Sequence, residues 1–402
     1  MILNENLSFE KAQYKRRGSH EKDTAMISDQ KDRISSIKLS KVKLPLLKSI
    51  SDAKVIQGKQ APLVDVDILL SQIYTSEGRS GLGFSYALRI GGEAQFAHAK
   101  EIAPLLIGED PSRISEIWDK LVWASASIGR SGLSVQSIAA FDIALWDLKA
   151  RKARVSLAKL IGSPWDSVPC YNTSGGYLQA PVEEIIEKAH QSRSRGIAGV
   201  KIKIGQDDVQ KDYQRVAAVR KSLGDEVPIM VDVNQQWKRK EALNNCLLFS
   251  DLGLTWIEEP LDAHDFGGHA QLSARVNTPI ATGEMLSSAR EHFDLMNQRG
   301  ADIVQPDAPR VGGITPFLKV ASEAERLELG LAPHFVMEIH IHLAASSRVE
   351  PWIEHFEWLE PLFNERLQIK DGRIVVPTQP GLGLTISDRV SEWTQAETTF
   401  SN

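Results

Sequence analysis

The run GVKIKIG at residues 199–205 is a short, mostly apolar stretch that ends at a glycine. Similar runs recur as far as residue 354, and helical patterns separate them. Their ranges are 169–173, 198–204, 228–233, 254–258, 279–283, 302–305, 329–333 and 350–354. Short strands that alternate with helices at a nearly fixed spacing indicate parallel β/α units. The eight runs predict a (β/α)₈ barrel that is slightly shorter than the usual ~250 residues.

Polar side chains interrupt these runs where the predicted strands end. Six successive units each supply one: Lys203, Asp232, Glu258, Glu284, Asp307 and His334. Any one of them could be a surface charge. In a barrel, however, the carboxyl ends of the strands meet on one face, and active sites are built there. Six polar residues in phase with the barrel repeat therefore predict a shared site.

Three of the six residues are carboxylates from successive strands, namely Asp232, Glu258 and Glu284. An all-oxygen ligand set with room for water and substrate suits Mg²⁺ far better than Zn²⁺, so we predict one Mg²⁺ per site. Glu259 follows Glu258 directly, and strand alternation turns it to the other side. Asn234 shares the side of Asp232 and is placed to contact a substrate.

The remaining polar residues suit proton transfer. Lys201 and Lys203 share one face of an otherwise apolar strand, where burial, mutual repulsion and a nearby dication would lower a lysine pKa toward the range of a general base. Asp307 and His334 end consecutive strands, and a carboxylate bonded to one imidazole nitrogen raises the basicity of the other. Glu354 ends the eighth strand and, if neutral, would donate a hydrogen bond. A base on each side of Mg²⁺ is suited to abstracting a proton next to a carboxylate, because cations stabilise the resulting enediolate.

The rest of the chain indicates further domains around the barrel. Residues 1–35 are polar and aperiodic, so we expect a flexible leader. Residues 36–160 are predicted to form an α+β domain, with β-like stretches at 37–46, 63–74 and 81–86 and helical patterns at 96–106, 112–123 and 135–161. The barrel then occupies 161–354, and we expect residues 355–402 to return to the first domain.

Composition excludes several classes of protein. The chain has 402 residues, with 47 Lys and Arg against 52 Asp and Glu and a net charge of −5. This balance gives no basic field for nucleic acid. Two cysteines, Cys170 and Cys246, are too few for a disulfide framework or a cysteine zinc site, and a reducing cytoplasm fits best. No apolar run approaches the ~18 residues that would span a bilayer, so we expect no membrane partner.

Taken together, the motifs resemble the enolase superfamily and, within it, the mandelate racemase subgroup. They are VKIKIG, MVDVNQQW, WIEEP, TGEM, QPDAPRVGG, APHFVMEIH and EPWIEHFEW. The resemblance covers residues 36–400 and implies an α+β capping domain over a modified (β/α)₈ barrel. By motif it implies a site with Mg²⁺ ligands Asp232, Glu258 and Glu284, bases Lys203 and His334, an Asp307 partner for the histidine, and substrate-carboxylate contacts from Lys201 and Glu354.

Further runs resemble the acid-sugar dehydratases of that subgroup. They are SDAKV at 51–55, GFSYALR at 83–89, CYNTSGGYL at 170–178 and EPWIEHFEWLEPLFNE at 350–365. The resemblance implies a carbon–oxygen lyase that removes water from a six-carbon aldaric acid such as L-talarate or galactarate, with some epimerisation. The distal carboxylate of such a diacid needs a cation, and Lys54 and Arg89 in the capping domain are candidates. Barrels of this kind commonly self-associate, so we expect a homo-oligomer.

Two alternatives remain open. A dehydratase for a monoacid sugar such as fuconate, or a racemase for a 2-hydroxy acid such as mandelate, would need no cation in the capping domain. A non-catalytic barrel used for binding or structure need not keep base, metal and acid residues together, and it is therefore the weakest alternative.

Overall fold

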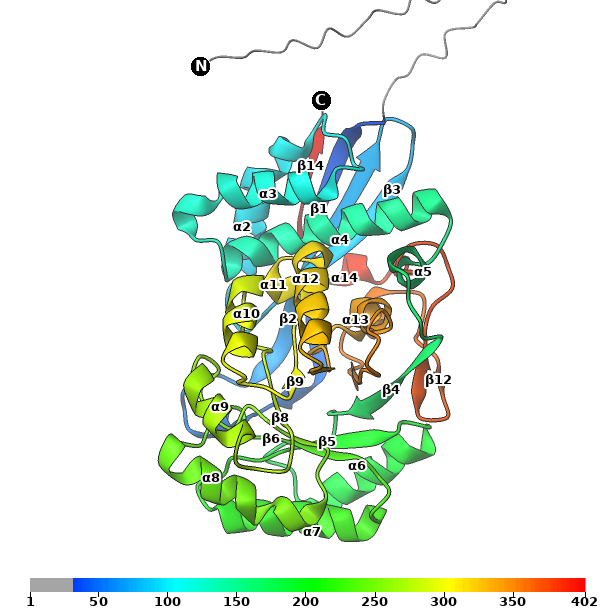
Figure 1. Cartoon of the computed structure of the whole chain (residues 1–402). Helices are drawn as coiled ribbons and strands as arrows, with labels where there is room; N and C mark the ends of the chain where they lie inside the picture. Colours follow the sequence, from blue (N-terminus) through cyan, green and yellow to red (C-terminus); the bar gives the residue numbers. More distant parts are fainter. Residues whose placement is uncertain (1–31, 402) are drawn as a thin grey trace, which may run out of the picture. The chain divides into compact units, whose positions relative to one another are not determined.

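The computed structural model describes residues 32–401, which form a four-stranded sheet and a larger sheet of mostly parallel strands (Figure 1). The expected leader, residues 1–35, lies outside the described residues as far as Lys31. Its last two residues are in fact the start of strand β1 (Ile34–Ile50), because Ile34 is fully buried in an apolar cluster. Among residues 32–401, no helix has the length and apolar character that crossing a membrane requires.

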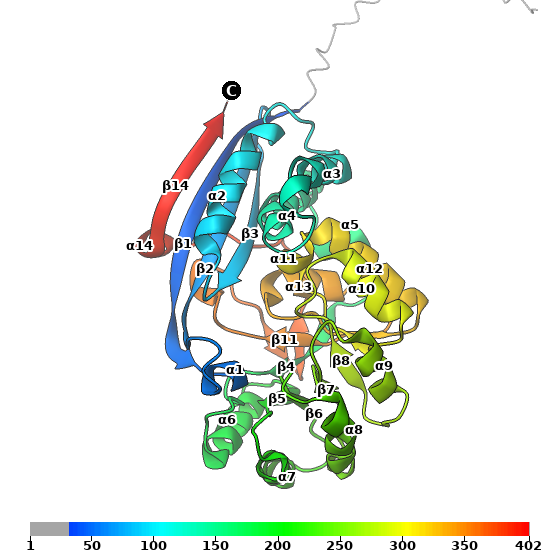
Figure 2. The same cartoon turned by 90° about the vertical axis from the view of Figure 1, so that its left-hand side faces the viewer.

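The smaller sheet forms the capping domain, and its strands run in the order β14-β1-β2-β3 (Figure 2). All neighbours are antiparallel: β1, β2 (Leu63–Thr75), β3 (Ser80–Leu88) and β14 (Thr394–Ser401). The segment 75–79 makes the hairpin turn between β2 and β3, with the Thr75 amide donating to the Arg79 carbonyl at 2.9 Å. Because Ser401 pairs with Ser36, the last strand of the chain completes the sheet that the first strand begins.

Three helices cover one face of this sheet: α2 (Gly92–Ile102), α3 (Ile114–Ala124) and α4 (Leu133–Ala153) (Figure 2). Two glycines of β3 let α4 approach closely. A Cβ atom on Gly81 would lie 2.1 Å from the Ala144 carbonyl oxygen, and one on Gly83 would lie 2.1 Å from that of Ala140. Any larger residue at either position would therefore push the helix off the sheet.

The single long helix expected from Val135 to Ile161 is wrong. The helix α4 ends at Ala153, Arg154 has a left-handed φ of 56°, and the separate helix α5 (Leu157–Ile161) follows. Ser156 caps α5 by accepting a hydrogen bond from the Lys159 amide. The Leu157 amide also donates to the carbonyl of Gly381 at 2.8 Å. The break thus arises from a helix cap together with a contact to the distant C-terminal segment.

Eight parallel strands form the barrel that the sequence predicts. They are β4 (Ser167–Asn172), β5 (Gly199–Lys203), β6 (Ile229–Asp232), β7 (Trp256–Glu258), β8 (Ile280–Thr282), β9 (Ile303–Val304), β10 (Gly330–Leu331) and β11 (Ile353–His355). Strands β4 to β10 pair in sequence order, and β11 pairs with β4. The Trp352 amide, just before β11, donates to the Leu331 carbonyl of β10 at 3.0 Å. This bond joins the two ends of the ring.

Helices follow most of the strands: α6 (Val182–Ser194), α7 (Val209–Leu223), α8 (Arg239–Leu248), α9 (Phe266–Ser273), α10 (Ala289–Asn297), α12 (Ile314–Arg326) and α13 (Met337–Ala344). Strand alternation separates two apolar layers. Met230 and Trp256 lie in a cluster with Tyr171, whereas Val231 and Ile257 belong to the layer that includes helix residues such as Val216. Short helices α1 (Ala53–Ile56), α11 (Ala308–Val311) and α14 (Val390–Trp393) lie in connections.

The C-terminal segment is divided between the two domains. We expected residues 355–402 to return to the capping domain, and β14 does so. The hairpin of β12 (Ile369–Lys370) and β13 (Arg373–Val375) instead pairs antiparallel with the barrel strand β4. Ile374 is fully buried there, because it packs with barrel residues such as Val168 and Ile353.

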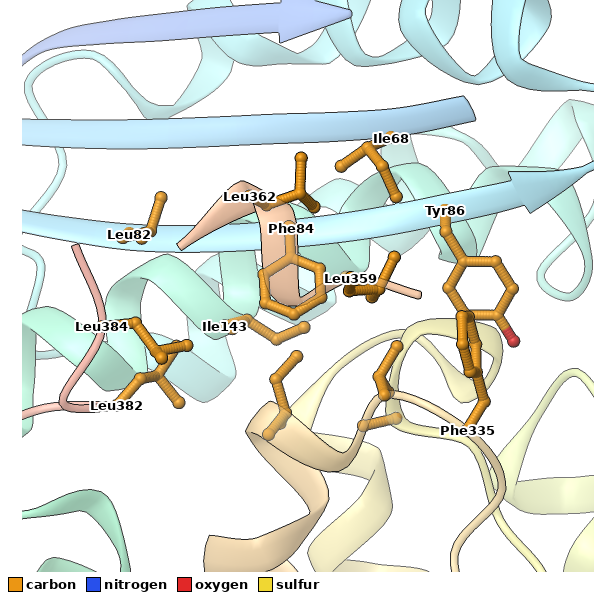
Figure 3. Packing of buried hydrophobic residues seen from close by; sticks show 14 of the residues in the cluster. Ile68, Leu82, Phe84, Tyr86, Ile143, Phe335, Leu359, Leu362, Leu382 and Leu384 are labelled. Atoms are coloured by element: carbon orange, nitrogen blue, oxygen red, sulfur yellow. The ribbon is translucent and has the colours of Figure 1, made fainter. Parts of the chain in front are cut away.

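A shared apolar core joins the two domains. Phe84 of β3 and Ile143 of α4 belong to one cluster with Phe335, Leu359 and Leu382, which come from the barrel and the C-terminal segment (Figure 3). This core fixes the inner surface of the capping domain relative to the ends of the barrel strands, as a substrate site built from both domains requires.

A buried carboxylate on α4 adds a polar contact between the two domains. Asp142 is 2% exposed and accepts hydrogen bonds from the Thr315 amide at 2.9 Å and the Thr315 hydroxyl at 2.6 Å, in the first turn of α12. Burial raises the pKa of Asp142 to about 7, although the bonds from Thr315 oppose this shift. The unfolded chain has a value of ~4 and loses the proton first, so stability should fall as pH rises between these values.

We predict that Asp142→Asn, which cannot ionise, gains stability relative to the natural chain as pH rises from 5 to 8. Urea denaturation at both pH values measures the difference in unfolding free energy between the two proteins. The matched control is Asp119→Asn on the exposed side of α3, for which that difference should stay constant. A constant difference for Asp142→Asn as well would contradict this interpretation.

Candidate active site

A cavity of about 460 Å³ lies between the capping domain and the carboxyl ends of the barrel strands. The capping domain contributes Lys54, Tyr86 and Arg89, and the barrel contributes Lys203, Asn234, Glu284 and His334. These are the ends of the strands where the sequence predicts a site.

Three buried carboxylates meet at one side of this cavity. One oxygen from each of Asp232, Glu258 and Glu284 lies within 4.8 Å of the others. The first two are paired in register at the ends of β6 and β7, and Glu284 follows β8 in a turn at Gly283, where φ is 130°. Asp232 and Glu258 are fully buried, while Glu284 is 7% exposed and lines the cavity.

The charges of this group fit a divalent cation. Burial and the neighbouring carboxylates Asp232 and Glu284 raise the pKa of Glu258 well above its usual value, although Lys201 lowers it. The carboxylate of Glu284 accepts no hydrogen bond from the described residues, and the Nε2 atom of His334 lies 3.8 Å from one of its oxygens. An oxygen-only set with free lone pairs facing a cavity fits Mg²⁺.

A second group of possible ligands lies after β11, where His355, Glu357 and Glu360 also bring atoms within 4.8 Å. Arginines already pair with both carboxylates: Arg195 with Glu357, and Arg366 with Glu360 at 3.3 Å. Because these charges are compensated by the protein itself, the electrostatic demand for a metal is greater at the ends of the strands.

The two lysines of β5 have different surroundings. Lys203 pairs with Asp232 and lines the cavity. Lys201 is 1% exposed, and its Nζ atom lies 2.6 Å from Glu258 and 2.8 Å from Glu354. Lys201 and Glu354 are not among the residues that line the cavity, and Lys201 lies between Glu354 and Glu258. The substrate contacts expected of both residues stay predictions.

The expected lowering of the Lys203 pKa is wrong where only the groups of the protein act on it. Burial is the largest single effect and lowers the pKa of Lys203, but the carboxylates Asp232, Glu284 and Glu258 together outweigh it, so the net pKa lies well above the usual value. The neighbouring ammonium group is evident from the sequence, whereas the distance from Lys203 to the carboxylates is set by the fold. Negative charge within ~4–6 Å favours the ammonium form.

The predicted histidine–aspartate pair is formed. Nδ1 of His334 lies 2.9 Å from Oδ2 of Asp307, which is fully buried. Burial raises the pKa of Asp307, but the bond to His334 and the charge of Arg310 lower it further, below its usual value. An ionised carboxylate only accepts hydrogen bonds, so Nδ1 must carry the proton. The Nε2 atom is then the ring nitrogen that can accept a proton, and it lies on the Glu284 side of the ring.

Several residues of the site were missed by the sequence analysis. Gln305 and Trp256 donate to Oε2 of Glu258 at 2.7 and 3.1 Å, and Thr173 donates to Glu354 at 2.7 Å. Arg310 donates to the Glu284 carbonyl at 2.5 Å, and Tyr86 donates to Asp307 at 2.6 Å. Gln305 lies two residues before Asp307, so strand periodicity could have indicated it. No local pattern places Tyr86, which comes from the capping domain.

The predicted substrate contacts differ in how freely they can bind an anion. Arg89 donates to Asp52 at 3.0 Å and to the Ala61 carbonyl at 2.8 Å, so its guanidinium is already engaged. The ammonium of Lys54 makes no hydrogen bond or ion pair with the described residues. Asn234 lines the cavity and donates to Asp232 at 3.1 Å. Lys54 is therefore the better candidate for a distal carboxylate.

Two family models match the chain. The model described as enolase C-terminal domain-like matches residues 184–390, and that of the mandelate racemase / muconate lactonizing enzyme N-terminal domain matches residues 59–162.

Individual relatives match nearly the whole chain. The L-talarate/galactarate dehydratase of Salmonella typhimurium is 52% identical and covers 94% of this chain and 95% of its own length. The arabinonate dehydratase of Saccharolobus solfataricus is 33% identical, with coverages of 85% and 93%. The crystal structure of L-talarate dehydratase from Polaromonas sp. JS666, complexed with Mg and L-glucarate, is 60% identical with a TM-score of 0.91, covering 92% of this chain and 100% of that one.

We predict that Mg²⁺ raises the thermal unfolding temperature of the protein and that Glu284→Gln weakens this effect, because the substitution removes one negatively charged ligand. Differential scanning fluorimetry over a Mg²⁺ titration measures both. The control is Glu357→Gln in the arginine-paired group, which should keep the natural Mg²⁺ response. If the loss occurred in Glu357→Gln and not in Glu284→Gln, the metal assignment would be wrong.

Proposed function

The chain belongs to the enolase superfamily, in its mandelate racemase group, and on that premise we propose that it is a Mg²⁺-dependent hydro-lyase that dehydrates a six-carbon aldaric acid such as L-talarate or galactarate. The observation that carries this proposal is the pair of bases, Lys203 and His334, which line one cavity beside three clustered carboxylates. The similarity to L-talarate/galactarate dehydratase over most of the chain supports the same reaction class.

Asp232, Glu258 and Glu284 would hold Mg²⁺, which supplies Lewis-acid stabilisation of negative charge on the substrate carboxylate. The protein supplies the orientation of these ligands. Lys201 bonds Glu258 from one side, and Gln305 and Trp256 bond its other oxygen.

Proton abstraction falls to Lys203 and His334. They come from β5 and from the loop after β10, so they reach the cavity from different parts of the ring. Removal of the α-proton leaves an enediolate, and a protonated base then donates to the departing β-hydroxyl group. Two bases from different directions let one site accept either configuration at the α-carbon. We therefore propose that some epimerisation accompanies dehydration.

The diacid substrate is supported by Lys54 in α1, whose ammonium has no hydrogen-bond or ion-pair partner among residues 32–401 and which lines the part of the cavity formed by the capping domain. A monoacid sugar or mandelate would leave this cation without a partner. Self-association and a cytoplasmic location stay predictions from the sequence.

We predict that Lys203→Ala and His334→Asn each lower dehydration by about 10²–10⁴-fold, the usual contribution of a general acid or base, and that EDTA abolishes turnover until Mg²⁺ is restored. Steady-state assays with L-talarate and galactarate measure these losses. Lys211→Ala, on the exposed side of α7, is the control and should keep full activity. Full turnover by Lys203→Ala, or in excess chelator, would contradict the mechanism.

We predict that Lys54→Met lowers kcat/KM for six-carbon diacids by about 10–100-fold, the value of one charge-assisted hydrogen bond, and leaves any monoacid activity unchanged. Assays of an acid-sugar library measure the ratio between the two substrate classes. Lys59→Met, at an exposed position shortly after α1, serves as control. Equal losses for diacids and monoacids would assign Lys54 to the fold and not to the distal carboxylate.

A further inference from the structure

The carboxylate that supports His334 is held by donors from three separate parts of the fold. Oδ2 of Asp307 accepts from Nδ1 of His334 at 2.9 Å and from the Tyr86 hydroxyl at 2.6 Å. Oδ1 accepts from the backbone amide of Arg310 at 3.0 Å. His334 and Arg310 belong to the barrel, whereas Tyr86 belongs to β3 of the capping domain. One of the three donors to this fully buried group is therefore supplied by the other domain.

The Tyr86 side chain is fixed on several sides. It is 2% exposed, and its ring packs edge-on against Phe335, with centroids 4.9 Å apart and planes at 89°. Figure 3 shows the two rings side by side below β3. The Arg310 guanidinium lies 5.8 Å from the ring centre. Because the ring is held in this way, the direction of the hydroxyl group is fixed, and it points toward Asp307.

The two donors to Oδ2 act on the same atom, so each constrains the other. The ionised carboxylate can only accept, and Tyr86 can only be the donor in their bond. Without the Tyr86 hydroxyl, His334 would be the single described donor to Oδ2. The carboxylate could then turn about the hydrogen bond that its Oδ1 atom accepts from the Arg310 amide. The imidazole would then lose the orientation that keeps Nε2 toward the cavity. The support of Lys203 is different, because its partner Asp232 lies on the neighbouring barrel strand.

We propose that Tyr86 is a positioning residue that couples the capping domain to the histidine base and not to the lysine base. The inference rests on the proposed function, since it assumes two bases that remove α-protons from different faces. The loss of the Tyr86 hydroxyl should therefore affect one kind of substrate and not the other. Substrates whose α-proton faces His334 depend on the Tyr86 hydroxyl, and substrates whose α-proton faces Lys203 do not.

The test is Tyr86→Phe, which removes one oxygen and keeps the ring that packs on Phe335. Exchange of the α-proton is followed by NMR in D₂O with Mg²⁺ for aldarates epimeric at C2. The Lys203→Ala and His334→Asn variants assign each substrate to a face, because exchange on a face survives when only the opposite base is removed. We expect about 10–100-fold slower exchange on the His334 face, the worth of one charge-assisted hydrogen bond, and less than about 3-fold on the Lys203 face. Equal losses on both faces would overturn the proposal.

Two further measurements separate positioning from general destabilisation. In an Asp307→Asn background, Tyr86→Phe should change exchange on the His334 face by less than about 2-fold, because residues that act through one shared group are not additive. Tyr213→Phe, which removes the hydroxyl that donates to Asp251 on the surface, controls for the loss of any tyrosine oxygen and should leave both faces unchanged. A full second loss in the Asp307→Asn background would show that Tyr86 does not act through Asp307.

A substrate-independent readout keeps the inference distinct from the proposed function. We expect the Nδ1 proton of His334, bonded to Asp307, to give a downfield ¹H resonance that is identified by its loss in His334→Asn. We expect Tyr86→Phe to shift this resonance and to speed its exchange with water. An unchanged resonance would overturn the positioning role even if no aldarate is turned over. Absence of exchange by the natural protein with every aldarate would overturn the proposed substrate class alone.

Discussion

Three carboxylates of like charge, Asp232, Glu258 and Glu284, meet where little water reaches them, and much of the surrounding structure compensates for this arrangement. Separating an ionised carboxylate from water costs several kcal/mol unless other groups replace the lost solvation. Lys201 and Lys203 each pair with one carboxylate. Two monovalent cations shared in this way leave Glu284 with free lone pairs. The three carboxylates therefore carry one negative charge more than the two ammonium groups, and an oxygen-only group with this excess fits a hard divalent ion.

The buried charges at the strand ends also give a physical reason for the capping domain. A group of buried charges is useful for catalysis only if substrate replaces water in the cavity, because electrostatic interactions strengthen as water is excluded. The capping domain closes the open end of the barrel through a shared apolar core that includes Phe84, Ile143 and Phe335. Asp142 adds a polar contact to the first turn of α12. The cap thus determines both the shape of the cavity and the dielectric environment of the barrel residues.

The sequence could predict whatever depends on periodicity. The eight strands and the polar residues at their ends follow from a repeat, because parallel strands bring their carboxyl ends to one face whatever the loops do. It could not predict the break at Arg154, which depends on a contact between Leu157 and the distant Gly381. Strand periodicity alone also could not separate Lys201 from Lys203, since both point to the same face and only the fold shows that Lys201 is buried against Glu258 and Glu354. The local pattern predicts on which face of a strand a side chain lies, whereas the burial of that side chain depends on the whole fold.

The two proposed bases also differ in which domain orients them. Lys203 takes its orientation from Asp232 on the adjacent strand, so the barrel alone determines its position. His334 takes its orientation from Asp307, whose Oδ2 atom also binds the Tyr86 hydroxyl of the capping domain. A cap that shifts by even an ångström would leave the first base intact and misalign the second, and misplacement of that size can cost about 10²-fold in rate. If Lys203 and His334 are the two bases, changes in the capping domain would therefore alter which face of a substrate reacts without any change in either residue.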